Sequence, residues 1–544
     1  MRRAARASAA AAFVCALVGL PRLARATGVM EFPDNGSEQE GRGGAWVARA
    51  SDPLATFYNP AGLAGQPTRL TLQGNLSRQG TCFTRTKAAG DPTQDGVQAG
   101  GAYPQVCNDG KVFPNPQLAF TYRLTDRIGL GIAILGPSAV GNVAWPDFGS
   151  GGAPSPQRDL LVSSSVLLLT PTIGVGWEPI DNLRIGASFI AGTAPSIDFV
   201  TVSPALGDAS EQNPGSNDVR AELKAKDWFV PGFTVGAIWT PTDRLDVAAW
   251  YKYMAPIDTK GDVVTQSNYY QYGYSNPASS KIVYGDTALA NCNNPMLSST
   301  NPCGNGNNAS IKVPLPMEGK LGLRYHHPRA DVPAEAHVRD PIKQDLFDVE
   351  ADLTWANDSA FDYLQIRFPG SAGGQGVIPA NPGITASAVL PPTADVRHHF
   401  SDVFGLRVGG DYNLLPDQLA LRAGGFFETQ AADPTFQNID FDAASRFGLA
   451  LGGTYRLRFG AEKRQALDLM LAYGHVFFST LSNTDPNAQG IPALTGEQCL
   501  GGVKTTAGGQ CANGAPQYRT PWPVNLGTIT SAIDVLNVGA SYAF

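Results

Sequence analysis

Charged side chains recur at every second position along several segments in the second half of the chain. Asp348, Glu350 and Asp352 share one face of a strand predicted over 346–368, because side chains two residues apart lie on the same side of a strand. Inward charges of both signs fit two kinds of chemistry. Acids and bases can form ion pairs inside a closed wall, because buried charges need partners, or one of the lysines or arginines can bind an anionic ligand group. The same alternation gives a charged face to neighbouring segments, with Asp246, Lys252, Lys320, Arg324, Arg407, Asp411, Arg422, Glu428, Arg446, Arg456 and Asp468.

Motifs for catalysis and metal binding are missing. The chain has no H-E-x-x-H, no G-x-x-x-x-G-K-[ST] and no G-x-S-x-G at a strand–helix turn. His326–His327 and His398–His399 are adjacent pairs, and strand neighbours point to opposite faces, which makes them poor bidentate metal ligands. We therefore expect no metal, no cofactor and no enzymatic activity. A triad built from distant residues would leave no motif, so the enzyme alternative stays open here.

The cysteines form three local pairs once Cys15 is set aside. The pairs lie in Gly-, Asn- and Pro-rich segments between predicted strands, and in an oxidising compartment they predict three loop disulfides, Cys82–Cys107, Cys292–Cys303 and Cys499–Cys511. Metal binding is the alternative, which the lack of C-x-x-C and the scarcity of histidine disfavour.

The segments that carry the charges alternate apolar residues with small or polar ones. In 127–135, isoleucines and a leucine occupy one face and glycines the other, a pattern typical of membrane barrels that turn apolar side chains to lipid. Segment 346–368 looks like two strands around 357–360, but a barrel with both ends in the periplasm needs an even count, so we predict one long strand with a bulge. Strands are expected near 68–79, 117–124, 127–135, 160–177, 183–200, 219–239, 245–259, 311–325, 346–368, 401–413, 418–429, 445–457, 465–479 and 527–544.

Composition and both ends of the chain agree with an exported all-β protein. Residues 1–26 read as a signal peptide, with three early arginines, a short apolar run and an Ala-Arg-Ala cleavage site. The net charge of −7 argues against nucleic acid as a partner. The last residues, 536–544, put Leu536, Val538 and Tyr542 on one face and stop at Phe544, as expected for a strand that closes a barrel at a membrane interface. An ordinary last strand of a β domain is the alternative.

Residues 27–66 do not read as a strand and carry a small-residue stretch, an acidic residue and an Asn-Pro-Ala tripeptide. Gly43, Gly44, Ala45, Ala48 and Asp52 are followed by Asn59, Pro60 and Ala61 just before the first strand. This segment resembles the N-terminal plug of the FadL family of long-chain fatty acid and hydrocarbon transporters. The resemblance continues through the strand order to the end of the chain. The cysteine pairs depart from the family pattern.

The resemblance implies a 14-stranded antiparallel transmembrane β-barrel (67–544) in the bacterial outer membrane, with a small plug (27–66) in its lumen. It implies passive uptake of fatty acids or related hydrophobic compounds from outer loops to a lumen pocket. The ligand would then leave sideways at a kink in strand three, for which Gly136–Pro137 is the candidate, the alternative being a strand that ends at a proline. Lys320, Arg407, Arg422 and Phe32 are the candidate ligand-binding residues.

Two other classes of function stay open at this point: a general porin, and a barrel enzyme or adhesin that acts through long outer loops. The expected partners are a hydrophobic ligand, outer-membrane lipid and lipopolysaccharide, and we expect a monomer.

Overall fold

The computed structural model describes residues 35–91, 95–136, 142–149, 153–203, 219–267, 281–284, 309–332, 337–367, 376–378, 388–390, 393–460, 464–491 and 522–544. The signal peptide, Phe32, Pro137 and four of the paired cysteines (Cys292, Cys303, Cys499 and Cys511) lie outside these residues. No helix in the described part of the chain is long and apolar enough to cross a membrane.

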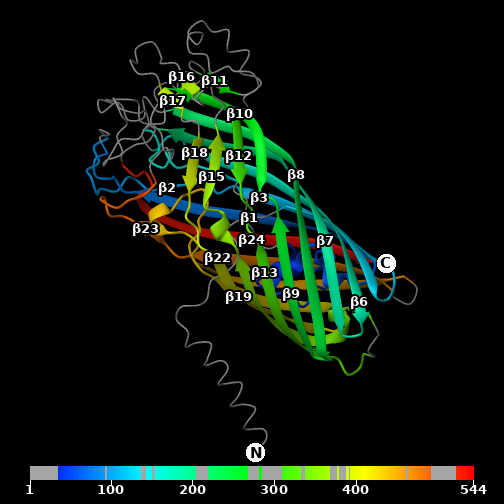
Figure 1. Cartoon of the computed structure of the whole chain (residues 1–544). Helices are drawn as coiled ribbons and strands as arrows, with labels where there is room; N and C mark the ends of the chain where they lie inside the picture. Colours follow the sequence, from blue (N-terminus) through cyan, green and yellow to red (C-terminus); the bar gives the residue numbers. More distant parts are fainter. Residues whose placement is uncertain are drawn as a thin grey trace, which may run out of the picture.

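One antiparallel sheet closes on itself as a barrel (Figure 1). The last strand pairs with the first along its whole length, from Arg69 opposite Ala543 to Arg85 opposite Gly527. The predicted count of fourteen strands is confirmed. The closed ring runs through β1 (Arg69–Arg85), β3 (Val112–Arg123), β4 (Ile128–Leu135), β6 (Ser163–Ile180), β7 (Leu183–Ser203), β8 (Val219–Thr242), β9 (Leu245–Met254), β13 (Glu318–Pro328), β14 (Asp345–Ala356), β19 (Val403–Leu415), β20 (Leu419–Glu428), β21 (Arg446–Phe459), β22 (Gln465–Phe478) and β24 (Gly527–Ala543).

The outer surface of the ring is apolar and the inner surface is polar, as the alternation predicts. Leu130, Ile132 and Ile134 are exposed on the lipid side, and Phe544 is exposed at the end of the chain. Every charged residue predicted to face inward from the second half of the chain is buried in the structure. Apolar side chains therefore face the lipid, where they need no hydrogen-bond partners. Polar and charged side chains face the lumen, where they find such partners.

Further strand segments extend part of the wall beyond the ring (Figure 1). On one side, the four ring strands β9, β13, β14 and β19 each continue past a break into β10, β12, β15 and β18. Pro256, Pro314 and Pro316 stand in two of these breaks and donate no ladder hydrogen bond. The segments outside the ring are β2 (Val106–Cys107), β5 (Val143–Ala144), β10 (Ile257–Ser267), β11 (Lys281–Tyr284), β12 (Ala309–Val313), β15 (Tyr363–Arg367), β18 (Thr393–Arg397) and β23 (Leu481–Asn483), with a separate pair β16 (Gly376–Ile378) and β17 (Ala388–Leu390).

The predicted bulge in strand nine is one of these breaks. β14 pairs with β13 and β19, whereas β15 pairs with β12 and β18, so the two pieces follow the same neighbours on either side of a short helical turn, η4 (Asp358–Ala360). The segment thus counts once in the ring, although the interruption is wider than a bulge. Two more short turns, α5 (Pro341–Gln344) and η5 (Pro434–Phe436), lie in connections between strands.

The segment before β1 forms a buried plug inside the ring. It contains α2 (Ser37–Gly41), α3 (Ala55–Tyr58) and η1 (Pro60–Leu63), and all of its residues from Asn35 to Gln66 are buried. Trp46, Leu54 and Leu63 are among its largest fully buried side chains. Too short to fold around a core of its own, this segment gains its burial from the barrel.

Candidate functional site

The barrel wall is interrupted beside β4, the third strand of the ring. β4 pairs with β6 up to Leu135 opposite Thr170, and pairing with β6 resumes only at Val143 opposite Ser164. On its other side, β4 pairs with β3 only as far as Ile134 opposite Leu118, while β3 continues to Val112 with β1 alone. Among the described residues, no ladder closes the wall over this stretch.

Polar side chains form hydrogen bonds with the Gly136 carbonyl, which, among the described residues, has no partner from a neighbouring strand at the break. The Gly136 carbonyl accepts hydrogen bonds from the side-chain amides of Asn35 and Asn115, each at 3.0 Å. The Asn35 carbonyl oxygen in turn accepts from Asn115 at 2.8 Å and from Gln117 at 2.9 Å. Since an unpaired backbone carbonyl at membrane depth is costly, these amides stabilise an open wall. Gly136 thus lies at the break, and its role as a gate stays a prediction.

An apolar pocket lies inside the barrel next to this break. One edge is formed by Ser164, Val166 and Leu168 of β6; Ser164 pairs with Val143 of β5, whereas Val166 and Leu168 face the interruption. The pocket is narrow: its cavity volume is about 30 Å³, within about 540 Å³ of space between the walls that includes open solvent. Its other walls come from β7, from the strands β10, β12 and β15, from the break between β12 and β13, and from the connection between β20 and β21: Ile197, Phe199, Ile257, Ile311, Val313, Leu315, Leu364, Asp440 and Phe441.

The charged positions in the sequence do not predict this pocket. Its lining is apolar, and it is assembled from strands and a connection far apart in the sequence. A weak signal was present in 197–202, where Ile197, Phe199, Val200 and Val202 depart from strict alternation and are all buried. A strand with apolar residues on both faces has a packed or ligand-filled inner side, rather than a wet one.

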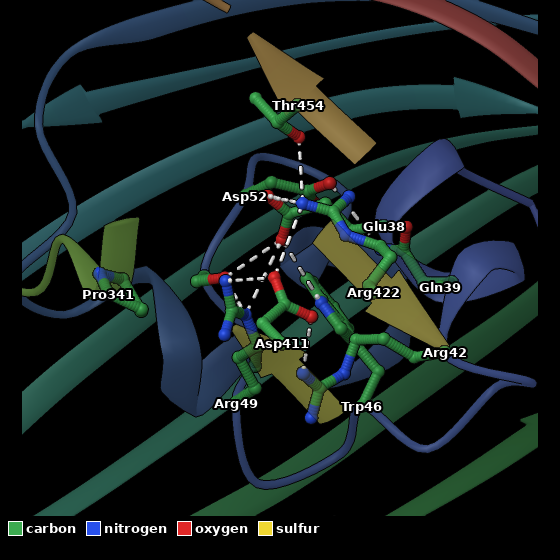
Figure 2. A network of polar contacts seen from close by, with 12 residues as sticks. Glu38, Gln39, Arg42, Trp46, Arg49, Asp52, Pro341, Asp411, Arg422 and Thr454 are labelled. Atoms are coloured by element: carbon green, nitrogen blue, oxygen red, sulfur yellow. Dashed lines mark hydrogen bonds and ion pairs between the residues drawn. The ribbon is translucent and has the colours of Figure 1, made fainter. Parts of the chain in front are cut away.

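The plug is tied to the wall by buried ion pairs (Figure 2). The Arg42 guanidinium lies 2.6 Å from Asp348, 2.7 Å from Asp411 and 3.1 Å from Glu350, and all four side chains are buried. Arg49 also pairs with Asp348, and with Asp411 at 3.0 Å. Inward carboxylates of β14 and β19 thus neutralise two plug arginines.

Backbone groups of the plug use the same carboxylates. The N–H groups of Trp46 and Val47 donate to Asp352 at 2.8 and 3.1 Å, and the Ala48 N–H donates to Glu350 at 2.6 Å. The alternating acids of β14 therefore act as an anchor for a loop that has no strand or helix partner for these donors.

Two plug carboxylates sit close together with opposite pKa shifts. Burial raises the pKa of Asp52 to about 7, and the negative charge of Glu38 adds to this effect. Burial acts in the same direction on Glu38, but Arg422 and Arg49 outweigh it and hold the pKa of Glu38 below its usual value. The Asp52 carboxyl accepts a hydrogen bond from the Leu54 N–H at 2.8 Å. The plug therefore holds one group that titrates near neutral pH.

The predicted ligand cations have protein partners. Arg407 pairs with Glu428 at 3.0 Å and lies over the Phe426 ring. Arg422 lies 3.3 Å from Asp411 and donates to Thr454 at 2.7 Å. Lys320 stacks over the rings of Tyr58 and Trp250, at 5.5 and 5.4 Å from their centroids. None of these three lines the apolar pocket, so their contact with a ligand stays a prediction.

The Asn-Pro-Ala tripeptide joins the plug to the wall. The Asn59 side chain accepts from the Ala61 N–H at 3.2 Å and donates to the Val47 carbonyl at 2.7 Å, which fixes the turn η1. Glycines on the inner wall make room for it: a Cβ at Gly186 would collide with Pro60, and one at Gly236 with Asn59. The plug motif is thus matched by glycines at inward strand positions.

The predicted disulfide Cys82–Cys107 is present and links β1 to β2. The other two pairs lie outside the described residues. Within the described part of the chain no group of His, Cys, Asp and Glu is arranged to hold a metal ion.

Comparisons with known proteins agree with this architecture. The model of the family "Outer membrane protein transport protein (OMPP1/FadL/TodX)" matches residues 24–508. A crystal structure of a Pseudomonas aeruginosa FadL homologue superposes with a TM-score of 0.62 at 19% identity, covering 95% of this chain and 99% of the other.

The Pseudomonas putida toluene transporter TodX superposes with a TM-score of 0.54 at 14% identity, covering 95% of this chain and 99% of the other. The sequences of curated proteins give no match. The alternatives of a barrel enzyme, an adhesin and a general porin are set aside, because the family consists of non-enzymatic channels for hydrophobic compounds. The chain belongs to the OMPP1/FadL/TodX family of outer-membrane transport proteins.

Proposed function

We propose that this channel takes up long-chain fatty acids or related hydrophobic compounds, holds them in the apolar pocket and releases them sideways through the break beside β4. The observation that carries the proposal is the position of Ser164, Val166 and Leu168. They form one wall of the pocket, and Val166 and Leu168 belong to the stretch of β6 that pairs with neither β4 nor β5. A molecule in the pocket therefore lies next to the interruption in the wall.

The energetics favour such a route for an apolar molecule. Moving from the pocket to the bilayer keeps the molecule out of water, since both surroundings are apolar. No energy source is needed, because the membrane acts as a sink for the ligand. The ion-paired plug meanwhile fills the lumen and opposes a continuous water channel.

Both substrate classes of the family, fatty acids and monoaromatic hydrocarbons, remain within the proposal. One relative is a FadL homologue and the other a toluene transporter, so fatty acids and monoaromatic hydrocarbons are the first candidates. Binding of lipopolysaccharide and the monomeric state remain predictions.

A matched pair of tryptophan variants tests the pocket. Val166→Trp places a bulky ring in the pocket, whereas Leu167→Trp places the same ring on the lipid side one residue away, where Leu167 is exposed. We expect Val166→Trp to reduce uptake of labelled oleate and toluene to the level of cells without the channel, and Leu167→Trp to leave uptake unchanged. Heat-modifiable migration in gels shows that both variants fold.

Equal uptake by both variants, with both barrels folded, would remove the pocket from the route. The lateral exit is tested separately by Pro137→Val, a substitution that favours continued strand pairing. It should lower uptake while ligand binding to the purified protein persists. Unchanged uptake in Pro137→Val would argue against the exit beside β4.

A further inference from the structure

A buried polar pair stands at the wall of the apolar pocket. Asp440 is the one ionisable residue among the described pocket lining, and it comes from the connection between β20 and β21. His398 follows β18, and its Nε2 lies 2.8 Å from the Asp440 carboxylate. Both residues are buried, His398 completely.

Aromatic rings pack around the His398 ring. The rings of Phe361, Phe400 and Phe441 lie 5.0, 4.9 and 5.9 Å from the His398 ring centroid. His398 Nδ1 has no hydrogen-bond partner among the described residues. Burying a carboxylate and an imidazole in such surroundings is costly, and neither side chain ties the plug to the wall. Their burial calls for a role at the pocket.

The Asp440 carboxylate keeps unused acceptor capacity. One oxygen accepts from His398 and the other from the Phe441 N–H at 2.8 Å, while a carboxylate offers about four lone-pair sites. A ligand hydroxyl would find an acceptor here. A ligand carboxylate would meet the Asp440 carboxylate, and no lysine or arginine lines the described pocket; only a protonated His398 would offset the like charge.

We propose that Asp440, positioned by His398, is a recognition site for the hydroxyl group of neutral hydrophobic molecules such as alkyl alcohols and phenols. The site favours them over hydrocarbons of the same shape and disfavours their carboxylate analogues. This inference rests on the proposed function and narrows it, because it assigns neutral compounds, rather than ionised fatty acids, to the same pocket.

Three probes of matched shape test the site on the purified full-length channel: 4-ethylphenol, ethylbenzene and 4-ethylbenzoate. Their affinities are compared by displacement of a fluorescent apolar probe. A hydrogen bond to a charged acceptor makes 4-ethylphenol bind about tenfold or more tightly than ethylbenzene, and 4-ethylbenzoate bind most weakly. Equal affinity for the phenol and the hydrocarbon would overturn the inference.

Two leucine variants assign the effect to a residue. Asp440→Leu should abolish the phenol preference while ethylbenzene still binds. Asp442→Leu is the matched control, since Asp442 is a buried acid two residues away that does not line the pocket. It should keep the preference. Loss of the preference in both variants, with folded barrels, would contradict a specific role for Asp440.

His398 is tested as a positioning residue. His398→Gln keeps an N–H donor for Asp440 and should keep the preference, whereas His398→Phe should weaken it. If Asp440→Leu does not fold, this pair still decides the outcome: a preference that is the same in both His398 variants contradicts the inference. Failure of all three probes to bind the wild-type channel would instead refute the proposed function.

Discussion

Replacing Arg42 with leucine should release the plug from the barrel wall. Arg42 is fully buried and lies between three inward carboxylates, at 2.6 Å from Asp348, 2.7 Å from Asp411 and 3.1 Å from Glu350. Leucine fills similar space but leaves these acids with less positive charge beside them. Arg49 still pairs with Asp348 and Asp411 in the variant. Glu350 has no such second arginine among the described residues, so it is the acid whose ion pairing is most weakened.

The size of the effect follows from the burial of the network. Removing one partner of a buried ion pair costs about 3–5 kcal/mol, because the remaining charge has neither water nor a counter-ion. Since Arg49 compensates two of the three acids, we expect about 3–4 kcal/mol. This corresponds to a shift of roughly 100- to 1,000-fold in the ratio of seated to released plug.

The assay is ion conductance in planar bilayers together with protease cleavage of the plug. Arg42→Leu should conduct steadily and expose its plug, and Arg42→Lys, which keeps the charge, should be intermediate. Arg127→Leu is the control, because the Arg127–Asp181 pair is exposed and contributes less than about 1 kcal/mol. A sealed Arg42→Leu channel with a protected plug would refute the reasoning.

Three further perturbations test other contacts. Burial and Glu38 raise the pKa of Asp52 from 3.8 to about 7, so the stability it contributes is present below about pH 4 and is lost as pH rises to about 7. Asp52→Asn should therefore remove a pH-dependent loosening of the plug, measured by proteolysis at pH 5 and 8. Gly409→Ala should displace the plug, because a Cβ there collides with the Arg42 carbonyl. Gly74→Ala is the control and should leave the plug in place, because no atom lies closer than 3.7 Å to a Cβ there. Ion conductance is measured for both variants. Cys82→Ser should loosen the outer connection closed by Cys82–Cys107, whose sequence separation of 25 corresponds to about 3.5 kcal/mol, giving faster proteolysis there with the barrel intact.

Alternation in the sequence was sufficient to predict the ring of strands. The period of two assigns each side chain to lipid or lumen, so Asp348, Arg407 and Asp468 could be placed inside without a structure. The even strand count also gave the correct treatment of 346–368. The side that a residue faces depends only on its position within one strand. The even strand count depends only on both chain ends lying on the same side of the membrane.

Contacts between distant segments could not be predicted in this way. Arg42 meets acids more than 300 positions away, and periodicity does not say which inward acid faces which plug cation. The apolar pocket depends on side chains of β6, β7, β10, β12 and β15 that meet at one level of the barrel, and on Phe441 from a separate connection. The charged lining of the lumen is therefore predictable from the sequence, and the apolar cavity is not.

Photocrosslinking would test the uptake route in a single experiment. A long-chain ligand that carries a diazirine is added from outside to cells, and the labelled residues are mapped by mass spectrometry. We predict labels on pocket residues such as Val166, Ile257 and Phe441, together with labels beside the β4 break near Gly136. Labels confined to lipid-facing residues such as Leu167 would show that the ligand bypasses the pocket and would contradict lateral release from it.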